Sequence, residues 1–323
     1  MSGTAHFAFE RDIDELEDQV ARLRDSAAKR GLDAGDELRV LSAKLDALRD
    51  ETYRNLAPME QVQAARHPKR PYTLDYIEGV FADWFELRGD RRYRNDEAII
   101  GGWARLDGES VMVIGHQKGR DMKENLRRNF GMPHPEGYRK ALRLMRMAAK
   151  FRRPVVTLID TPGAYPGFGA EERGQAEAIA TNLREMARLR VPSICVVIGE
   201  GGSGGALALG VTDRILVLEH SIYSVISPEG CAAILWRSAD EREKAASALR
   251  LTSADLFALG VADEVIAEPP GGAHTDPGSA MQSVSRSLCR HLGELGQVDT
   301  DQLLASRWAK YESLGTWVEA GSS

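Results

Sequence analysis

The first fifty residues place apolar side chains at the spacing of an amphipathic helix, in two successive stretches. The first stretch has them three or four positions apart: Ile13, Leu16, Val20 and Leu23. The second stretch repeats this spacing: Leu38, Leu41, Leu45 and Leu48. Gly31 and Gly35 lie between the stretches, so the pattern predicts a helical hairpin over residues 8–55. Such a hairpin can be an arm packed on its own domain or an arm that grips a partner subunit.

Residues 67–153 mix helix-like and strand-like patterns after a short linker with two prolines, His67-Pro-Lys-Arg-Pro71. We predict a helix, two strands and a second helix here: residues 73–87, 98–104, 111–116 and 136–151. Thr73 is the expected cap of the first helix, and Asp75 in its first turn favours the helix dipole. The Asp107-Gly108 pair is expected to form the turn between the two strands.

Beyond Pro154 the pattern changes to apolar runs that lack polar alternation. Four such runs predict strands: residues 155–160, 191–198, 214–219 and 262–267. Helical stretches follow these runs, one beginning at Pro228, and further helices are expected over residues 279–314. Apolar strands alternating with helices indicate a parallel sheet that is covered on both faces. The predicted fold class is therefore α/β.

Composition narrows the functional classes. The chain has 323 residues and a net charge of −6, which suits one or two globular domains and makes nucleic-acid binding improbable. Its three cysteines, Cys195, Cys231 and Cys289, form no CxxC pair, so neither a zinc ribbon nor a redox dithiol is expected. Cys195 and Cys231 are expected to be buried thiols. The sequence shows no signal peptide and no membrane-length apolar run, so we expect a cytoplasmic or organelle-matrix protein.

Two glycine-rich turns follow two of the predicted strands. The first turn spans residues 160–169, where Gly163, Gly167 and Gly169 are expected to allow positive φ angles. The second turn, residues 199–210, has six glycines in twelve positions. Ligands bind at the carboxyl ends of parallel strands, so both turns are expected to face one cleft. Backbone N–H groups exposed there would stabilise a developing anion, although the glycines can also serve only tight helix–strand packing.

Three other motifs compete for the second turn. A phosphate-binding loop is excluded because no lysine follows either turn. The dinucleotide pattern GxGxxG matches residues 199–204, but any glycine-rich segment can match it. The pattern G-x-S-x-G at residues 201–205 would make Ser203 the nucleophile of a hydrolase. Candidate partners of that serine are His220, His274 and His291, with Asp263 or Asp276 to orient one of them.

Several side chains near these turns can take part in binding or catalysis, or can have a purely structural role. Lys118, Arg120 and Arg128 can bind substrate phosphates or a carboxylate, or can form a solvated basic face. His116 ends a predicted strand and can donate a hydrogen bond in the cleft or be structural. Glu200, inside the second turn, can act as a general acid or base or can brace the loop. Tyr165 and Tyr223 can pack on a flat ligand or belong to the core.

Seven segments together resemble one known family, the alpha subunits of the bacterial-type acetyl-CoA carboxylase carboxyltransferase. The resemblance runs from the N-terminal helices to about residue 275 and rests on these segments: residues 70–75, 115–120, 128–132, 135–140, 159–167, 199–205 and 224–231. It implies a crotonase-like fold of repeated β-β-α units. It also implies three regions: a helical extension at residues 1–66, the carboxyltransferase domain at 67–278 and C-terminal helices at 279–323.

The resemblance further implies transfer of a carboxyl group from carboxybiotin, held on a biotin carboxyl carrier protein, to acetyl-CoA. The N–H groups of Gly204 and Gly205 would hold the biotin ureido oxygen. The cofactor would lie against Gly163, Ala164, Gly201, Gly202 and Ser203. The implied partners are a beta subunit with a zinc ribbon in an α2β2 assembly, the carrier protein and biotin carboxylase. No metal is expected on this chain, and a non-catalytic scaffold for the beta subunit is a further alternative.

Overall fold

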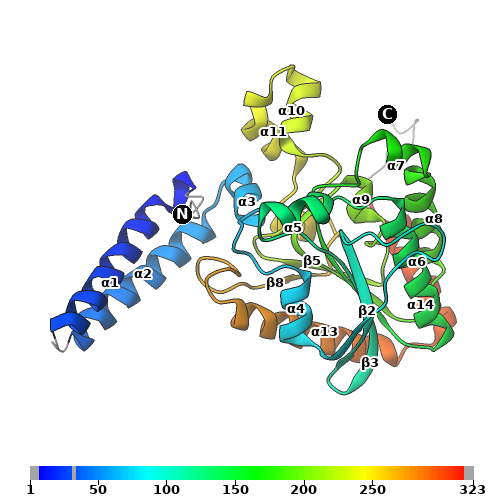
Figure 1. Ribbon diagram of the computed structural model, residues 1–323, viewed down its shortest axis with the longest axis horizontal. Coiled ribbons are helices and arrows are strands. Elements are labelled where there is room, and N and C mark those ends of the chain that lie inside the picture. The colour runs from blue at the N-terminus through cyan, green and yellow to red at the C-terminus, as the bar shows by residue number, and fades with distance from the viewer. Residues whose placement is uncertain (1–6, 31–33, 316–323) are drawn as a thin grey trace, which may run out of the picture.

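One mixed β-sheet of eight strands forms the centre of the molecule (Figure 1). The structure is a computed structural model, and it describes residues 7–30 and 34–315. Seven strands follow one another across the sheet in the order β1-β2-β3-β4-β5-β6-β8, and β7 pairs with the end of β5. The strands are β1 Ala82–Glu86, β2 Ile99–Leu106, β3 Glu109–His116, β4 Val155–Thr161, β5 Ser193–Gly202, β6 Arg214–Leu218, β7 Ile222–Ser224 and β8 Glu264–Ile266.

The parallel part of the sheet is as predicted, and an antiparallel edge is added to it. Strands β3, β4, β5, β6 and β8 are parallel to one another, whereas β2 is antiparallel to both of its neighbours, β1 and β3. The predicted turn joins β2 to β3, and both of its residues have positive φ, 48° at Asp107 and 81° at Gly108. Such a two-residue turn matches the twist of the strands that it joins.

The prediction of one helix over residues 73–87 is wrong in its second half. Helix α4 (Thr73–Val80) ends early, and β1 pairs along β2 with Phe85 opposite Trp103. Pairing at the open edge of the sheet therefore outweighs the local helical pattern. Thr73 is also not the cap, because its hydroxyl donates to the carbonyl of His116. The carboxylate of Asp75 instead accepts the backbone N–H of Tyr72.

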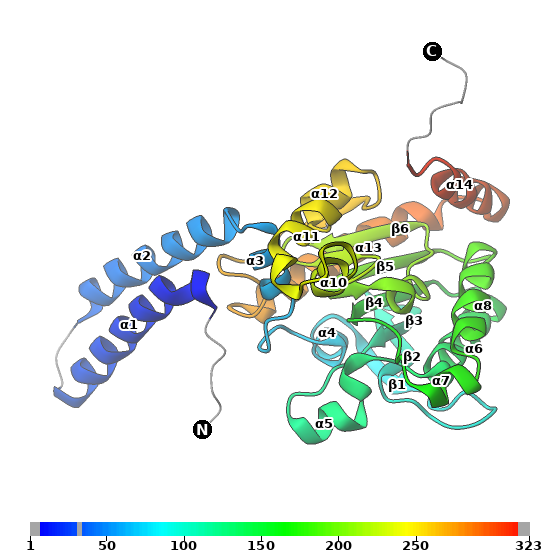
Figure 2. The same ribbon diagram turned by 90° about the horizontal axis from the view of Figure 1, so that it is seen from above.

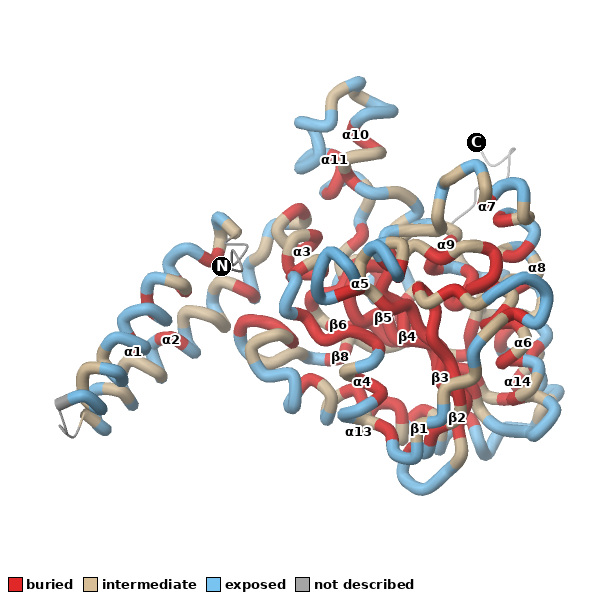
Figure 3. The backbone as a smooth tube through the Cα atoms, viewed as in Figure 1, coloured by how far each residue is buried: buried red, intermediate tan, exposed pale blue. Residues whose placement is uncertain are grey.

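Helices cover both faces of the sheet (Figures 2 and 3), and alternate strand residues point to opposite cores. On β3, Met112 and Ile114 join a core with α6 and α8, while Val111 and Val113 join one with α4 and α13. Apart from the two helices of the N-terminal hairpin, the remaining α-helices are α3 Pro58–Ala65, α5 Met122–Arg127, α6 Pro135–Lys150, α7 Phe168–Glu172, α8 Gln175–Ala187, α9 Ser203–Leu207, α10 Pro228–Trp236, α11 Arg242–Leu249, α12 Ser253–Ala258, α13 Pro277–Gly296 and α14 Thr300–Glu312.

The predicted N-terminal hairpin is present and extends away from the sheet as an arm (Figures 1 and 2). It consists of α1 (Arg11–Arg30) and α2 (Gly35–Arg54), which bury their apolar faces against each other. Gly31 lies outside the described residues. Helix α3 was not predicted and connects the arm to the linker before α4.

The C-terminal helices are present as predicted and belong to the packed body. Arg307 of α14 is 2% exposed and donates to Asp213 and to the carbonyls of Met186 and Leu189. Cys195 and Cys231 are buried, as expected. Among the described residues, no helix has the length and apolar character needed to span a membrane.

Candidate active site

The two glycine-rich turns meet at the carboxyl ends of β4 and β5. Thr161 at the end of β4 is in register with Gly201. A Cβ atom placed on Gly202 would lie 2.1 Å from the carbonyl oxygen of Pro162, and one placed on Gly205 would lie 2.4 Å from the nitrogen of Ala164. The turns therefore touch through backbone atoms, and glycine at these two positions is what lets them approach so closely.

Strand β5 runs four residues past its predicted end and passes directly into a short helix. The strand ends at Gly202, and α9 begins at Ser203, which has a φ of +53°. Gly204 and Gly205 lie in the first turn of α9, where backbone N–H groups have no intrahelical acceptor. Two backbone N–H groups thus lie at the start of a helix, at the junction of the two turns, and N–H groups at such a position are suited to binding an anion.

The glycines of the first turn are required for different reasons, conformational freedom at one position and close packing at another. Gly163 has a φ of +149°, as expected for a residue chosen for its conformational freedom. The same expectation is wrong for Gly167, whose φ is −76°, and for Gly169, which lies within α7. An added Cβ on Gly167 would instead lie 2.3 Å from the ring of Tyr165, so packing explains that glycine.

A buried network of charges lies beneath the second turn. The ammonium group of Lys118 donates to Asp160 at 2.7 Å and to Glu200 at 2.9 Å. Arg66 donates to the other oxygen of Glu200 at 2.8 Å and to Glu229 at 2.9 Å. Asp160 also accepts the backbone N–H of Glu200 at 3.1 Å. The network ties the start of the turn to α3 and to β4.

The protonation of this network favours a bracing role for Glu200. Burial acts to raise the pKa of Glu200, but the charges of Lys118 and Arg66 outweigh it and lower that pKa to about 2. Burial likewise opposes the charge on Lys118, yet Asp160 and Glu200 raise its pKa. Glu200 is therefore ionised and paired twice, which leaves it poorly suited to act as a general acid or base near neutral pH.

The other two predicted basic residues also have protein partners. Arg120 donates to the carbonyl of Arg70 at 2.9 Å, pairs with Asp75, and lies 3.9 Å from the ring centre of Tyr72. Arg128 is 6% exposed and donates to the carbonyl of Glu97 at 2.9 Å. Lys118, Arg120 and Arg128 thus each bind another part of the chain. Their predicted binding of substrate stays a prediction.

The aromatic and imidazole candidates near the turns make their contacts with other parts of the protein. Tyr223 lies directly against Gly201, where an added Cβ would be 2.3 Å from its ring. Tyr165 meets the ring of His134 edge-on, with 4.2 Å between ring centres. His116 is fully buried, and burial lowers the pKa of this imidazole to about 3, so it is neutral. These contacts suit supporting roles.

The predicted partners of a Ser203 nucleophile make their contacts elsewhere. His220 meets the ring of Tyr53 at the base of the arm, and His274 stacks on His67 with 3.8 Å between ring centres. His291 lies 2.8 Å from Glu264. Asp263 pairs with Lys310, and Asp276 caps α13. The described part of the chain therefore gives Ser203 no recorded contact with a histidine or acid of the kind that a hydrolase requires.

Three side chains at the base of the arm could hold a metal ion, because ligand atoms of Glu10, His67 and His274 lie within 4.8 Å of one another. The hydroxyl of Tyr53 already donates to Glu10, and the two imidazoles are stacked. Burial lowers the pKa of His67 to about 4 and that of His274 to about 3, so both rings are neutral near pH 7. These contacts anchor the arm to the body of the protein.

Known proteins place this arrangement in one family. A family model described as acetyl co-enzyme A carboxylase carboxyltransferase-like matches residues 6–315. A protein of Gemmatimonas aurantiaca named acetyl-coenzyme A carboxylase carboxyl transferase subunit alpha is 57% identical over 322 residues, covering 99% of this chain and 100% of that protein. A protein of the same name from Thermus thermophilus is 54% identical over 311 residues, covering 96% and 98%. The chain belongs to this family of carboxyltransferase alpha subunits.

Solved structures of other proteins share the fold of this chain. A transcarboxylase 12S structure matches with a TM-score of 0.57 and 21% identity, covering 70% of this chain and 42% of that one. A Pseudomonas malonate decarboxylase hetero-tetramer in complex with coenzyme A matches with a TM-score of 0.56 and 20% identity, covering 68% and 89%. The predicted crotonase-like fold is thereby confirmed.

Two charged residues of this alpha subunit that support the site escaped sequence reasoning. Arg66 was not singled out, although it holds Glu200 from outside the turn. Arg70 is 2% exposed, pairs with Glu268 and donates to the carbonyl of Ile198 on β5 at 3.1 Å. The sequence signal is slight: Arg66 immediately precedes the linker at residues 67–71, and Arg70 lies within it. Their partners are more than a hundred residues away, which no local pattern reveals.

Replacing Lys118 by glutamine is expected to lower the free energy of unfolding by about 3–5 kcal/mol, because Asp160 and Glu200 would remain buried without their shared cation. Urea unfolding of the full chain measures this change. Lys123→Gln is the matched control, since Lys123 lies exposed on the neighbouring helix α5. A Lys118→Gln protein as stable as the Lys123→Gln control would contradict the bracing role of the network.

Proposed function

We propose that this chain transfers a carboxyl group from carboxybiotin to acetyl-CoA, giving malonyl-CoA, as the alpha subunit of an acetyl-CoA carboxylase carboxyltransferase. Family membership supports the reaction. The observation that carries the role of this chain is the start of α9, which lies against the turn at residues 160–169 and where no acceptor is recorded for the N–H groups of Gly204 and Gly205 among the described residues. This pair of donors is the part of the chain best suited to transition-state stabilisation.

The first turn of α9 has room for the group that it would hold. A Cβ atom on Gly204 would have its nearest neighbour, a methyl carbon of Ile179, 3.8 Å away, so the space beside that N–H is open. Carboxybiotin would supply the carboxyl group, and its release would place negative charge on the ureido oxygen. The N–H groups of Gly204 and Gly205 would donate to that oxygen, and the helix dipole would add to the stabilisation.

The surrounding backbone would position the same group. Gly163, Ala164, Gly201, Gly202 and Ser203 come from the two turns that meet beside the donors. The network of Lys118, Asp160 and Glu200 would keep these turns fixed, so that little reorganisation is needed when charge develops. The reaction would need no side-chain base from this chain, because biotin that has released its carboxyl group would be basic enough to take the proton from the acetyl group.

The chain would supply one half of the complete site. The alpha-subunit name of its relatives implies a complex with a beta subunit. We propose a zinc-ribbon beta subunit in an α2β2 assembly, where its own pair of N–H donors would hold the enolate of acetyl-CoA. Carboxybiotin would arrive on the biotin carboxyl carrier protein after loading by biotin carboxylase.

This proposal is tested by assaying malonyl-CoA formation with the beta subunit present, using wild-type chain and Ser203→Ala. We expect Ser203→Ala to keep activity within about threefold of wild type, because the role proposed for residue 203 belongs to its backbone, which alanine retains. A serine hydrolase would behave differently: the isolated chain would cleave activated esters, and Ser203→Ala would stop this. That second outcome would overturn the proposal.

A further inference from the structure

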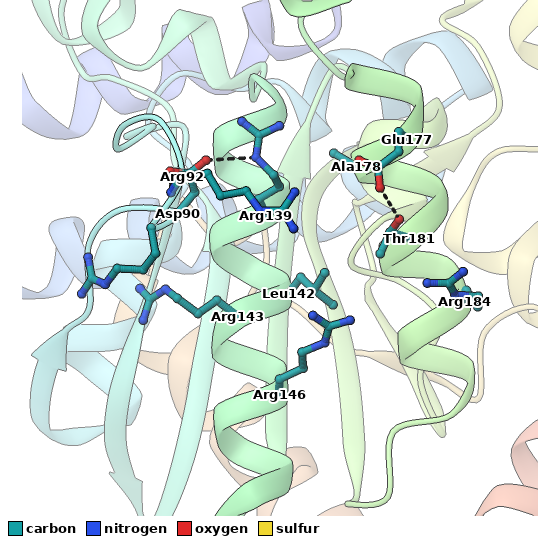
Figure 4. A pocket seen from close by; sticks show the side chains of 11 residues that line it. Asp90, Arg92, Arg139, Leu142, Arg143, Arg146, Glu177, Ala178, Thr181 and Arg184 are labelled. Atoms are coloured by element: carbon teal, nitrogen blue, oxygen red, sulfur yellow. Dashed lines mark hydrogen bonds and ion pairs between the residues drawn. The ribbon is translucent and has the colours of Figure 1, made fainter. Parts of the chain in front are cut away.

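A pocket rich in arginine lies beside α6 and α8 and involves neither glycine turn (Figure 4). Its volume is about 440 Å³, which is within the range of small-molecule sites. We call it the arginine pocket, and its charged lining residues are Asp90, Arg91, Arg92, Arg139, Arg143, Arg146, Glu177 and Arg184. Six guanidinium groups thus share the pocket with two carboxylates, in a chain whose net charge is −6.

The two acids of the pocket are already engaged. Asp90 accepts Nε of Arg139 at 2.9 Å and also binds backbone N–H groups of its own loop. Glu177 accepts the hydroxyl of Thr181 at 2.9 Å, one turn along α8. Acids outside the pocket pair with three of its arginines: Glu136 with Arg139, and Glu185 with Arg146 and Arg184. Among residues 7–30 and 34–315, no ion pair is recorded for the other three arginines, so the pocket carries an excess of positive charge.

The arginines are held with part of their hydrogen-bonding capacity unused. Arg143 donates to the carbonyls of Gly89 and Leu87, which leaves its positive charge without a carboxylate partner. Burial lowers the pKa of Arg143, and the neighbouring charge of Arg91 lowers it further. For the guanidinium of Arg92, no partner is recorded among residues 7–30 and 34–315.

The loop that carries two of these arginines is preorganised. One oxygen of Asp90 accepts the backbone N–H groups of Arg92, Tyr93 and Arg94 at 2.8–3.1 Å. Arg91 has a φ of +64°, so the loop turns sharply at that residue. A fixed loop reduces the entropy lost on binding, which favours a built site over a mobile basic surface.

We propose that the arginine pocket binds a phosphorylated small molecule through its phosphate groups. Guanidinium forks match the oxygen geometry of phosphate, and converging forks in a concave site select a multiply charged anion. The inference does not depend on the reaction assigned to the glycine turns. Two sources share this chemistry: the phosphates of coenzyme A and those of a free nucleotide or pyrophosphate.

The binding test uses isothermal titration calorimetry of the full chain with pyrophosphate and with adenosine 3′,5′-bisphosphate at low ionic strength. We expect a Kd below about 1 mM for at least one of these probes, and about tenfold weaker binding by Arg92→Gln, the value of one charge-assisted hydrogen bond. Arg188→Gln is the matched control, because Arg188 is exposed just past the end of α8 and does not line the pocket. No binding of either probe at 5 mM, or equal affinities for the two variants, would overturn the proposal.

Two further measurements distinguish coenzyme A from a free phosphorylated ligand, and either of them from a protein partner. In the complex with the beta subunit, a raised KM for acetyl-CoA in Arg92→Gln would assign the site to coenzyme A phosphates, and an unchanged KM would assign it to a free phosphorylated ligand. An acidic surface of the partner could also neutralise the pocket. Two results together would show this alternative and overturn the proposal. The Arg92→Glu, Arg184→Glu double variant would fail to assemble with the beta subunit, and the wild-type complex would no longer bind the probe.

Discussion

Replacing Gly205 by alanine is expected to abolish carboxyl transfer and to destabilise the chain. The added methyl group would lie 2.4 Å from the nitrogen of Ala164 and 2.5 Å from the carbonyl carbon of Gly163, which are backbone atoms of the other turn. Neither turn can yield by rotating a side chain, so the two must separate. Both Gly205 and the turn at residues 160–169 would then leave the positions from which they act.

The matched control for this change is the neighbouring glycine. In Gly204→Ala the added methyl group would have its nearest neighbour, on Ile179, at 3.8 Å, which is an ordinary contact. We expect this control to unfold within about 2 °C of wild type and to lose much less activity than Gly205→Ala, which loses more than a hundredfold. A Gly205→Ala protein with wild-type melting temperature and turnover would refute the close packing of the two turns.

Replacing Gly204 by proline is expected to lower kcat by about 10²–10³-fold, equivalent to about 2.7–4 kcal/mol, because it removes one proposed oxyanion donor. Proline has no backbone N–H, and its fixed φ is compatible with the first turn of a helix. The open space beside Gly204 can also accept the ring. Steady-state kinetics of malonyl-CoA formation, with the beta subunit present, measure this effect.

Gly204→Ala serves as the control here as well, since alanine keeps the N–H and adds bulk at the same point. Comparing the two variants therefore distinguishes loss of the N–H donor from the effect of added bulk beside it. Circular dichroism and co-elution with the beta subunit show whether each variant folds and assembles. A folded, assembled Gly204→Pro protein with the kcat of Gly204→Ala would rule out this donor, whereas loss of activity only together with assembly would indicate a scaffold.

Sequence patterns predicted the parallel sheet well, because its buried strands are apolar on both sides. The turn at Asp107-Gly108 was equally clear, since its residue types suit the two positive φ angles that the structure shows. Residues 82–86 were misassigned because they form an edge strand, and its pairing with β2 outweighs the local pattern. Helix α3 escaped prediction since its eight residues show no clear apolar period.

Sequence reasoning also singled out the two glycine turns and many residues around them. It could not tell that Lys118 and Glu200 pair with each other, since 82 positions separate them. Sequence reasoning likewise left two roles open for Glu200, general acid or base and brace of the loop. The choice between them depends on the contacts of Arg66 and Lys118 with its two carboxylate oxygens. Such pairings arise from the topology of the sheet, which places distant segments side by side, and leave no periodic trace.

Reconstitution tests the central claim most directly: this chain contributes half of a carboxyltransferase site. A fixed amount of the chain is titrated with its beta subunit, and malonyl-CoA formation from acetyl-CoA and carboxybiotin is followed. The account predicts no activity from either protein alone, and activity that rises with added beta subunit and saturates at one beta per alpha. Malonyl-CoA formation by the isolated chain, or none by a mixture that co-elutes as a complex, would contradict it.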